Sequence, residues 1–275
     1  MPERLTPEAA WQVVQLARHQ DRPQTLDYVA EALPDFLELA GDRLHADDKA
    51  VVGGLATLGR HRIVLIGHQK GRTLAERQER RFGMACPEGY RKGIRLARLG
   101  EKFGLPVVTL VDTPGAYPGK DAEEGGQAGA IARSIETFVN LRVPTVTVII
   151  GEGGSGGALA LAAADRVLML ENSIYSVISP EGCAALVWRN AEEAPRAAAA
   201  LRLAAPDLLE LGLIDGVVPE PPGGAHTDPR TTVKRVMREV ELALSELKRL
   251  DSSELLARRR AKYLAMGRYA IASPR

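Results

Sequence analysis

The stretch GEGGSGG fills positions 151–157 and has glycine at five of its seven positions. The apolar run VPTVTVII (143–150) leads into it, and the run ALALAAA (158–164) leads out. This pattern is typical of a strand that turns sharply into a helix. Glycine loses more conformational freedom on folding than any other residue, so a cluster this dense needs a physical reason. The N-terminus of a helix exposes unpaired N–H groups and a partial positive charge, which suits an anion or a developing oxyanion.

A dinucleotide site is one explanation of the cluster. Gly151, Gly153 and Gly156 satisfy the G-x-G-x-x-G pattern, and Glu171 follows about 20 residues on, where a ribose-binding acid would belong. Against this hypothesis, the next helix has room for only about two turns, which is short for a βαβ unit of about 30 residues.

A serine hydrolase is a second explanation. Gly153, Ser155 and Gly157 match the G-x-S-x-G nucleophile elbow, and Asp215 and His226 follow in the order Ser, Asp, His. That order is weak evidence in a chain with many aspartates, and the neighbouring glycines explain the surroundings of the serine without nucleophilicity.

A third explanation uses the backbone alone. If Gly156 and Gly157 open a helix, their N–H groups can point together at a carbonyl oxygen that becomes negative during a reaction. The missing side chains would let a substrate approach closely. The plainer alternative is that the glycines only permit a tight turn and close helix packing, and the pattern itself leaves these explanations open.

A second special loop, DTPGAYPG (112–119), follows the buried strand expected at LPVVTLVD (105–112). Its prolines and glycines fix a turn that holds Ala116 and Tyr117 at the tip. In an open α/β sheet, binding crevices lie beyond the carboxyl ends of the strands. Two rigid glycine-bearing loops at successive strand ends therefore predict the walls of one pocket.

Strands alternate with helices along the rest of the chain, which predicts an α/β protein with a layered core. Short helices are expected over 6–40, with Thr6 as N-cap, Pro7 at the first helical position and breaks at Pro23 and Pro34. Extended segments 50–59 and 61–68 predict an antiparallel hairpin. Further helices are expected over 88–104, 123–140 and about 183–212, and further extended segments over 165–170, 174–182 and 213–221. We expect one compact domain over 41–275 with a helical extension over 1–40.

Two helices have faces that can be assigned from their spacing. In the segment 88–104, Ile94, Ala97 and Phe103 are expected inward, and Arg91, Arg95 and Arg98 outward. The last helix is amphipathic, with one apolar face formed by Val233, Val236, Met237, Val240, Leu244 and Leu247. Its basic residues, including Arg258, Arg259 and Arg260, are expected to lie on a solvated face.

Composition excludes several classes of function. The 36 basic and 35 acidic residues leave a formal charge of +1, and aromatic residues make up 4% of the chain, so nucleic-acid and membrane-surface roles lack support. The N-terminus lacks the apolar centre of a signal peptide, and no apolar run approaches the roughly 18 residues of a membrane span. Cys86 and Cys183 form no C-x-x-C pair. These features predict a cytoplasmic protein without a metal site of its own.

Seven segments carry a family resemblance, and they occur in order through about residues 25–270. They are GDRLHADDKAVVGGLA (41–56), IGHQKGR (66–72), FGMACPEGYRKGIRLARL (82–99), VDTPGAYPG (111–119), GEGGSGGALA (151–160), YSVISPEGCA (175–184) and EPPGGAH (220–226). Together they resemble the carboxyltransferase alpha subunit of bacterial multi-subunit acetyl-CoA carboxylase.

The resemblance implies a ClpP/crotonase-type fold built from repeated ββα units. It also implies transfer of a carboxyl group from carboxybiotin, held on the biotin carboxyl carrier protein, to acetyl-CoA, giving malonyl-CoA for fatty-acid biosynthesis. In this family the alpha chain works with a zinc-bearing beta subunit as an α2β2 assembly, alongside biotin carboxylase. The cofactor implied is biotin on a partner protein, and the family's zinc would belong to the partner chain.

The family mechanism implies roles for particular residues. The N–H groups of Gly156 and Gly157 would form an oxyanion hole for the ureido carbonyl of biotin. The partner's hole would serve the thioester enolate, and biotin would be the base. The biotin-side wall would consist of Thr113, Pro114, Gly115, Ala116, Tyr117, Gly153 and Gly154.

Two other groups of residues bear on the resemblance. Gly125 and Gly129 stand where the family pattern predicts Arg and Glu. The loss of two charges would either weaken contacts between subunits or be neutral on an exposed helix face, and we expect the neutral outcome, since surface changes are usually small. Arg91, Lys92 and Arg95 would either meet CoA phosphates or the carrier protein, or form a solvated helix face, and we expect the solvated face.

Overall fold

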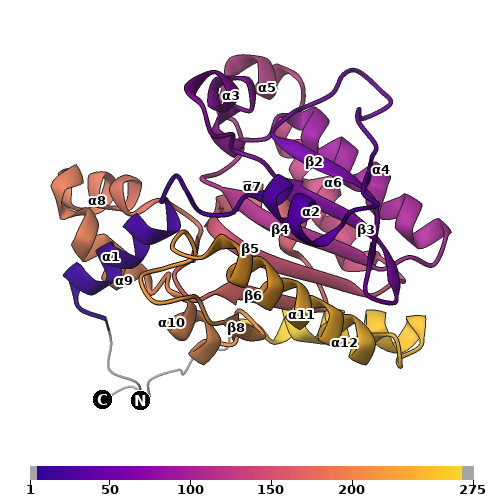
Figure 1. Cartoon of the computed structure of the whole chain (residues 1–275). Coiled ribbons are helices and arrows are strands. Elements are labelled where there is room, and N and C mark those ends of the chain that lie inside the picture. The colour runs from indigo at the N-terminus through magenta and orange to yellow at the C-terminus, as the bar shows by residue number, and fades with distance from the viewer. Residues whose placement is uncertain (1–4, 268–275) are drawn as a thin grey trace, which may run out of the picture.

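The computed structural model describes residues 5–267. Its centre is an eight-stranded sheet of order β1-β2-β3-β4-β5-β6-β8, with β7 paired to β5 outside that path (Figure 1). The strands are β1 (Leu37–Glu38), β2 (Val51–Leu58), β3 (His61–His68), β4 (Val107–Thr113), β5 (Thr145–Gly154), β6 (Arg166–Leu170), β7 (Ile174–Ser176) and β8 (Gly216–Val218). The helices are α1 (Pro7–Ala17), α2 (Thr25–Ala32), α3 (Leu74–Glu79), α4 (Pro87–Lys102), α5 (Lys120–Glu124), α6 (Gln127–Asn140), α7 (Ser155–Ala162), α8 (Pro180–Trp188), α9 (Ala194–Leu201), α10 (Ala205–Glu210), α11 (Pro229–Leu247) and α12 (Ser252–Ala265), with short 3-10 turns η1 (Arg81–Gly83) and η2 (Ala191–Glu193).

The sheet begins with the expected antiparallel hairpin and continues with parallel strands. β2 and β3 pair from Val51 opposite His68 to Leu58 opposite His61, which confirms the hairpin. The pairs β3–β4, β4–β5, β5–β6 and β6–β8 are all parallel. The carboxyl ends of β3, β4 and β5 therefore meet at one edge of the sheet, which is where binding crevices form in such folds.

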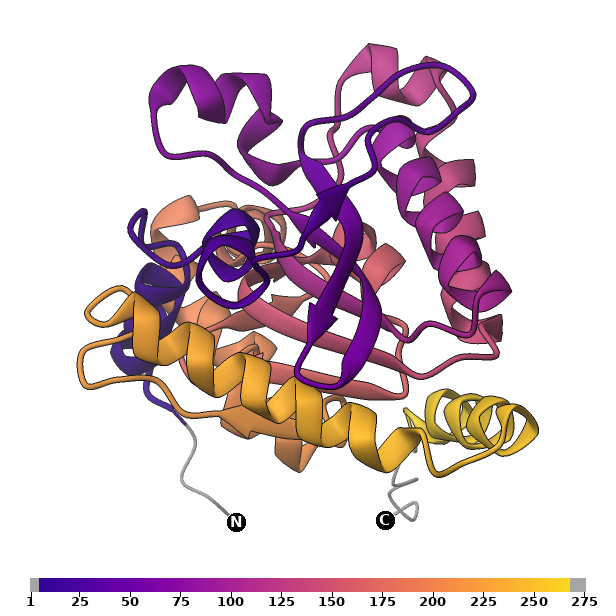
Figure 2. The same ribbon diagram turned by 45° about the vertical axis from the view of Figure 1, so that its right-hand side comes forward.

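Helices cover both faces of the sheet, so the strands are buried on both sides. On one face, α4, α6 and α7 pack through a cluster that includes Leu96, Phe138 and Leu161. On the other face, α2 and α11 pack through Tyr28, Val236 and neighbouring residues. Figure 2 shows α11 running along its face of the sheet. The chain thus forms the layered α/β core that the alternation of strands and helices predicts.

The amphipathic face predicted for α11 is confirmed. All six apolar residues assigned to it are buried: Val233, Val236, Met237, Val240, Leu244 and Leu247. The start of α1 is also as expected, because the Thr6 hydroxyl accepts a hydrogen bond from Ala9 N–H and Pro7 is the first helical residue. Local spacing and capping chemistry determine both features.

Three details of the expected elements are wrong. The helix expected over 123–140 is two helices, because Gly126 adopts a left-handed φ of 86° between α5 and α6. The extended segment expected over 174–182 ends early, since Ser179 caps α8 through its contact with Gly182 N–H. Phe103 is 62% exposed rather than inward, because it lies at the C-cap of α4, where the helical periodicity stops.

Residues 5–40 pack against three parts of the molecule. α1 contacts α9 at one end of the sheet, α2 contacts α11, and β1 pairs with β2. Figure 1 shows α1 beside α8 and α9. The boundary expected at residue 40 stays a prediction. Among the described residues, no helix is long and apolar enough to cross a membrane.

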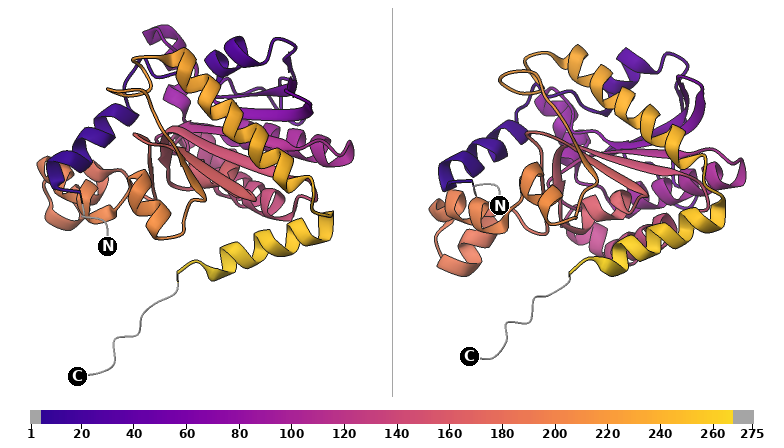
Figure 3. Two further views of the ribbon diagram at one scale, coloured as in Figure 1. Left: turned by 60° about the horizontal axis from the view of Figure 1, so that its bottom comes forward. Right: turned by 90° about the horizontal axis from the view of Figure 1, so that it is seen from below.

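The C-terminal helix is fastened by a buried arginine, which corrects the expectation that Arg259 lies on a solvated face. Its guanidinium is buried and pairs with Asp165 at 2.7 Å. It also donates to the carbonyls of Phe138, Leu141 and Val143. The neighbouring Arg258 and Arg260 are exposed, as expected. Figure 3 shows the chain turning from α11 into α12, and this cation anchors α12 to the loops around α6 and β5.

Replacing the buried cation should destabilise the whole domain. We expect Arg259→Met to lower the free energy of unfolding by about 3–5 kcal/mol, because it leaves Asp165 and several carbonyls without their donor. Arg258→Met, at an exposed helical pair with Glu254, should cost at most ~0.5 kcal/mol. Urea unfolding of both variants measures the difference, and equal midpoints would contradict the structural role of Arg259.

Candidate active site

The glycine stretch forms a direct strand-to-helix junction. β5 continues through Gly154, and α7 starts at Ser155 without an intervening loop. Ser155 adopts a left-handed φ of 53°, which turns the chain sharply. No side chain caps α7 at this end. The N–H groups of its first turn, including those of Gly156 and Gly157, therefore form a donor surface where β5 ends.

Close approach explains the glycines on either side of the turn. A Cβ on Gly154 would overlap the Pro114 carbonyl, and one on Gly157 would overlap the Ala116 nitrogen. At Gly156 a Cβ would meet only Ile131 Cγ2 at 3.5 Å, an ordinary van der Waals contact. The packing therefore requires glycine at 154 and 157, whereas a side chain at 156 would make only an ordinary contact with Ile131.

The loop at 113–117 is the structure that approaches this junction, as the sequence predicted. Thr113 Oγ1 donates to the Gly115 carbonyl at 2.7 Å and accepts from Gly115 N–H at 3.1 Å. Tyr117 N–H donates to the Ala85 carbonyl, and the Gln127 amide bridges the carbonyls of Ala85 and Tyr117. Each end of the loop is therefore fixed by hydrogen bonds, and its middle packs against the junction.

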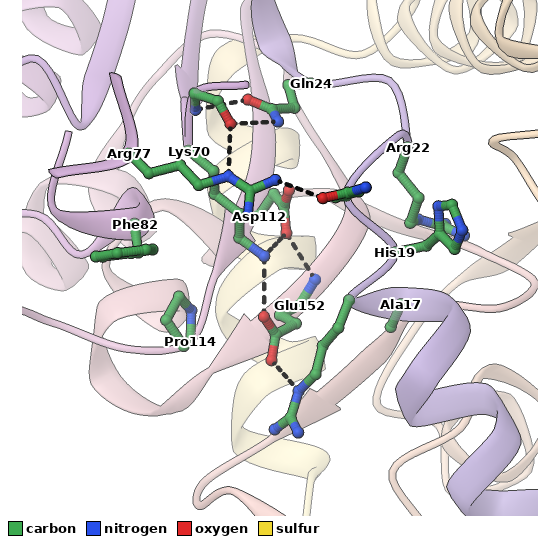
Figure 4. A pocket seen from close by; sticks show the side chains of 13 residues that line it. Ala17, His19, Arg22, Gln24, Lys70, Arg77, Phe82, Asp112, Pro114 and Glu152 are labelled. Atoms are coloured by element: carbon green, nitrogen blue, oxygen red, sulfur yellow. Dashed lines mark hydrogen bonds and ion pairs between the residues drawn. The ribbon is translucent and has the colours of Figure 1, made fainter. Parts of the chain in front are cut away.

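A buried charge cluster lies beneath these two walls, and the sequence analysis missed it. Lys70 Nζ lies 2.7 Å from Asp112 Oδ1 and 2.9 Å from Glu152 Oε1. Glu152 N–H also donates to Asp112 Oδ1, and Arg18 Nε pairs with Glu152 Oε2 at 2.7 Å. Figure 4 shows the side chains of Lys70, Asp112 and Glu152 converging from different segments. The cluster joins the ends of β3, β4 and β5 to α1.

The members of the cluster keep one another ionised. Burial alone would raise the pKa of Glu152, but Lys70 and Arg18 outweigh burial and hold that pKa below its usual value. Burial alone would lower the pKa of Lys70, but Asp112 and Glu152 outweigh it and hold that pKa above its usual value. Glu152 and Lys70 consequently both stay ionised across the neutral range.

A pocket of about 210 Å³ opens beside the cluster. Its walls come from the α1–α2 connection, the α3–η1 segment and the ends of β3, β4 and β5, and they include Arg18, His19, Lys70, Arg77, Phe82 and Pro114. Figure 4 shows Phe82 and Pro114 on one side of this pocket and Ala17 and His19 on the other. Pro114 belongs both to the pocket and to the loop that touches the junction.

The serine hydrolase hypothesis is wrong, because its triad is not assembled. Ser155 follows the carboxyl end of β5, whereas Asp215 precedes the amino end of β8, so they lie at opposite edges of a parallel sheet. The Asp215 carboxylate accepts from Val167 N–H and pairs with Lys262. The His226 ring stacks on His19 with centroids 3.7 Å apart.

The features of the dinucleotide hypothesis have other structural roles. The helix after the glycines, α7, has eight residues. The Glu171 carboxylate accepts the backbone N–H of Glu220 at 3.0 Å, so the acid expected to hold a ribose instead fastens two segments of the chain. Packing within the chain explains two of the three glycines of the motif, because a Cβ on Gly151 would overlap the Asp112 carboxylate and one on Gly153 would lie 2.8 Å from the Tyr175 ring.

Arg98 of α4 is exposed, as expected, but Arg91, Lys92 and Arg95 bind the segment 39–48, so the solvated face expected for these three residues is wrong. Lys92 is buried and contacts the Asp47 carboxylate and the Asp48 carbonyl. Arg95 donates to the carbonyls of Leu39 and Gly41. Arg91 likewise pairs with Asp42 and Glu88. These cations hold the segment 39–48 against the helix.

The glycines that depart from the family pattern are exposed. Gly125 caps α5, and its carbonyl accepts a hydrogen bond from Arg91. A Cβ on Gly129 would meet no atom within 4 Å. Side chains at position 129 would therefore project into solvent, as expected for that helix face.

Two signals in the sequence could have indicated the charge cluster. Asp112 ends the apolar strand VVTLVD, and Glu152 interrupts the run from Thr145 to Gly154. An acid within a strand that is buried on both faces needs a partner. The sequence gives no sign that this partner is Lys70, because that pairing depends on the order of the strands. Among residues 5–267, no group of three or more metal-ligating side chains lies close enough together to hold a metal ion.

The cluster predicts a specific pH dependence of stability. Glu152→Gln should lower the free energy of unfolding by about 3 kcal/mol at pH 7, because Lys70 and Arg18 lose a buried partner. The depressed pKa of Glu152 means that its stabilisation is present above the unfolded-state value of about 4.3 and is lost as pH falls through the folded-state value. The difference between wild type and variant should therefore shrink below about pH 4.

Urea titrations between pH 3.5 and 8 measure this difference. Glu79→Gln is the matched control, since Glu79 forms an exposed pair with Lys49 and should contribute less than ~1 kcal/mol at any pH. A Glu152→Gln difference that is unchanged on acidification would contradict an ionised Glu152 in the folded chain.

Comparisons with known proteins identify the family of this chain. The profile of the family described as acetyl co-enzyme A carboxylase carboxyltransferase-like matches residues 3–267. A relative from Thermus thermophilus, named acetyl-coenzyme A carboxylase carboxyl transferase subunit alpha, is 56% identical over 268 residues, covering 98% of this chain and 84% of the relative. A relative of the same name from Paramagnetospirillum magneticum is 55% identical over the same shares of both chains.

Solved structures with low sequence identity share the fold. Transcarboxylase 12S with methylmalonyl-coenzyme A and methylmalonic acid bound superposes with a TM-score of 0.68 at 19% identity, covering 88% of this chain and 44% of that one. The beta subunit of geranyl-CoA carboxylase from P. aeruginosa gives 0.62 at 18% identity, covering 98% and 48%. These neighbours confirm the crotonase-type fold. In the present chain the first ββα unit is β2–β3–α4, whereas single strands precede α6 and α7. The chain belongs to the acetyl-CoA carboxylase carboxyltransferase family.

Proposed function

We propose that this chain is the alpha subunit of an acetyl-CoA carboxylase carboxyltransferase. In the proposed reaction, a carboxyl group passes from carboxybiotin on the biotin carboxyl carrier protein to acetyl-CoA, giving malonyl-CoA for fatty-acid biosynthesis. Membership of the family supports the reaction class. The observation that carries the proposal for this site is the uncapped junction at Gly156 and Gly157, held against the 113–117 loop.

The junction has the properties that a biotin site requires. Biotin, when bound, supplies the ureido ring that carries the carboxyl group. A Cβ on Gly156 would make only an ordinary contact with Ile131, so packing within the chain does not require glycine there. In the proposal, a ligand atom reaches the N–H groups of the first turn from this side. We infer that Gly156 and Gly157 donate to the ureido oxygen as it gains negative charge, a stabilisation that fixed dipoles provide without reorganisation.

The surrounding residues orient the ligand. In the proposal, the biotin-side wall consists of Thr113, Pro114, Gly115, Ala116, Tyr117, Gly153 and Gly154. The hydrogen bonds of Thr113 and Gln127 keep this wall rigid, and Gly154 lets Pro114 approach the strand. Correct positioning of two reactants contributes much of the rate of a transfer reaction, so a rigid wall has a direct catalytic value.

The proposal includes partners, because the thioester half of the site would lie on another chain. We propose a zinc-bearing carboxyltransferase beta subunit, assembled with this chain as α2β2 in the cytoplasm, together with the biotin carboxyl carrier protein and biotin carboxylase. The word "alpha" in the names of the relatives supports a multi-subunit enzyme. The enolate of acetyl-CoA would be stabilised by the partner, whereas this chain would bind biotin.

The first experiment measures the reverse reaction with this chain alone, the beta subunit alone and the two together. The assay follows decarboxylation of malonyl-CoA that depends on a free biotin derivative. We expect activity only in the mixture, because each chain supplies half of the site. Equal activity from the beta subunit alone would contradict a catalytic role for this chain.

Substitutions at the junction should separate backbone from side-chain catalysis. Ser155→Ala should keep most of the activity of the assembled enzyme, since the proposal gives its hydroxyl no role. Gly157→Val should lose at least ~10²-fold in kcat, the loss typical of an oxyanion donor. Valine at position 157 also collides with Ala116, so this variant can lose activity through misfolding. Gly156→Ala is a less disruptive variant, because its methyl group fits within the fold and, in the proposal, lies beside the ligand.

Gly156→Ala should keep the wild-type unfolding midpoint and lose roughly tenfold or more in kcat, because a small displacement of the reacting groups is costly. Stoichiometric labelling of Ser155 by a fluorophosphonate, or complete inactivity of Ser155→Ala, would contradict the proposal. Full activity of both glycine variants would leave the chain a structural subunit only.

A further inference from the structure

The segment after α3 holds an unusual run of backbone strain. Arg81, Phe82 and Gly83 have consecutive φ values of 47°, 56° and 83°. The left-handed conformation is costly for residues with a Cβ, and it persists only where the surroundings impose it. Two adjacent non-glycine residues in this region therefore indicate that the position of their side chains has a function.

Contacts on both sides of Phe82 impose this conformation. A Cβ on Gly83 would lie 2.9 Å from the Asp112 carbonyl and from Lys70 Cγ, so the chain passes directly over the charge cluster. On the other side, Arg81 lies 3.5 Å from Asp48 and 5.2 Å from the centre of the Tyr117 ring. Contacts with the charge cluster on one side, and with Asp48 and Tyr117 on the other, thus hold the strained run in place.

The strain places a large aromatic ring at the edge of the pocket. Phe82 is 43% exposed, although its size favours burial, and it lines the pocket together with Pro114. Figure 4 shows the two rings on the same side of the pocket. An apolar ring that is held in the open at an energetic cost is available to pack against a ligand.

The same pocket contains a cation without a carboxylate partner. The other three cations of its lining pair with acids: Arg18 with Glu152, Arg22 with Glu220, and Lys70 with Asp112. Within residues 5–267, Arg77 forms no ion pair. Its hydrogen bonds reach only the Gly71 carbonyl and Gln20 Oε1, each at 3.4 Å. The guanidinium of Arg77 is therefore available for an anion.

We propose that Phe82 and Arg77 form a binding subsite for a ring that carries an anionic group. Phe82 packs against the ring, and Arg77 pairs with the carboxylate. This inference rests on the proposed function, under which the ligand is the carboxylated biotinyl group before it reaches the glycine junction. Pro114 connects the two places, because it lines the pocket and touches Gly154.

The first test concerns stability and needs no catalysis. Phe82→Ala and Phe82→Gly both remove the ring, but only glycine also removes the strain. We expect Phe82→Gly to melt about 2–4 °C above Phe82→Ala, the reverse of the usual order of these residues. Arg189→Ala and Arg189→Gly are the matched controls at an exposed left-handed residue with φ 54°, and should show the same order. Equal melting of the two Phe82 variants would overturn the claim of imposed strain.

The second test measures binding of a neutral ligand, the methyl ester of biotin, to the assembled enzyme by calorimetry and by KM in the reverse reaction. Phe82→Ala and Phe82→Gly should both weaken binding about tenfold with kcat nearly unchanged, and Phe82→Tyr should restore it. The Arg189 variants should bind like wild type. Wild-type Kd and KM in both Phe82 variants would overturn the role of the ring.

The third test separates the charge from the ring. Arg77→Gln should raise KM for the carboxylated carrier protein about tenfold, and should change binding of the neutral ester less than twofold. Arg98→Gln, at an exposed cation of α4 outside this pocket, is the control and should change neither. If Arg77→Gln weakens binding of the uncarboxylated carrier protein as much as binding of the carboxylated one, Arg77 contacts the carrier protein itself. The proposal that Arg77 pairs with the carboxylate is then wrong.

These outcomes distinguish the inference from the function on which it rests. A wild-type mixture without biotin-dependent activity would refute the proposed function. An active wild type whose Phe82 and Arg77 variants bind normally would refute only the subsite.

Discussion

The bond on which the site depends is the one between the Lys70 ammonium group and the carboxylates of Asp112 and Glu152. Each partner stands at or just beyond the carboxyl end of a different strand: Lys70 after β3, Asp112 in β4 and Glu152 in β5. Burying these charges is costly, so the cluster is stable only when all three strand ends are in register. Because the glycine junction follows Glu152 and the 113–117 loop follows Asp112, the same bonds set the distance between the two walls.

Neighbouring glycines of the junction have different roles: packing requires two of them, and the proposed chemistry requires another. Gly154 and Gly157 lack side chains because the Pro114–Ala116 backbone occupies that space. At Gly156 a Cβ would make only an ordinary contact with Ile131, so packing does not account for this glycine, and the proposal instead places a ligand beside the donors of α7. The strained run at Arg81–Gly83 lies over the same cluster, so one set of buried charges supports the junction, the loop and the pocket wall together.

The sequence predicted those features that local chemistry determines. The β2–β3 hairpin follows from two extended segments with a tight turn, and α11 from apolar spacing that one face satisfies completely. The motif DTPGAYPG and the glycine stretch both follow strands of a parallel sheet, and the structure packs them against each other. That they form two walls of one binding pocket stays a prediction, because Pro114 alone of the predicted site residues lines the pocket beside the charge cluster. The family resemblance supplied the fold name and the reaction, which no spacing argument could have given.

Contacts between distant segments were not predictable in this way. Nothing in the run RRR (258–260) distinguishes buried Arg259 from its exposed neighbours, since its partner Asp165 is 94 residues away. Lys92 was expected on the surface because the acidic loop that covers it has no helical or strand pattern. The Lys70 cluster was missed for the same reason: charges that pair across strand ends become visible only when the strand order is known.

The central claim is that a backbone N–H group of the glycine junction stabilises negative charge on the ligand. The most direct measurement replaces the peptide bond between Gly156 and Gly157 by an ester, using glycolic acid at position 157 in cell-free translation. This change removes one N–H donor and adds no side chain. The account predicts that the assembled enzyme loses at least ~10²-fold in kcat for biotin-dependent malonyl-CoA decarboxylation, with a KM for biotin close to that of the all-amide chain made the same way. An ester enzyme with wild-type kcat would contradict it.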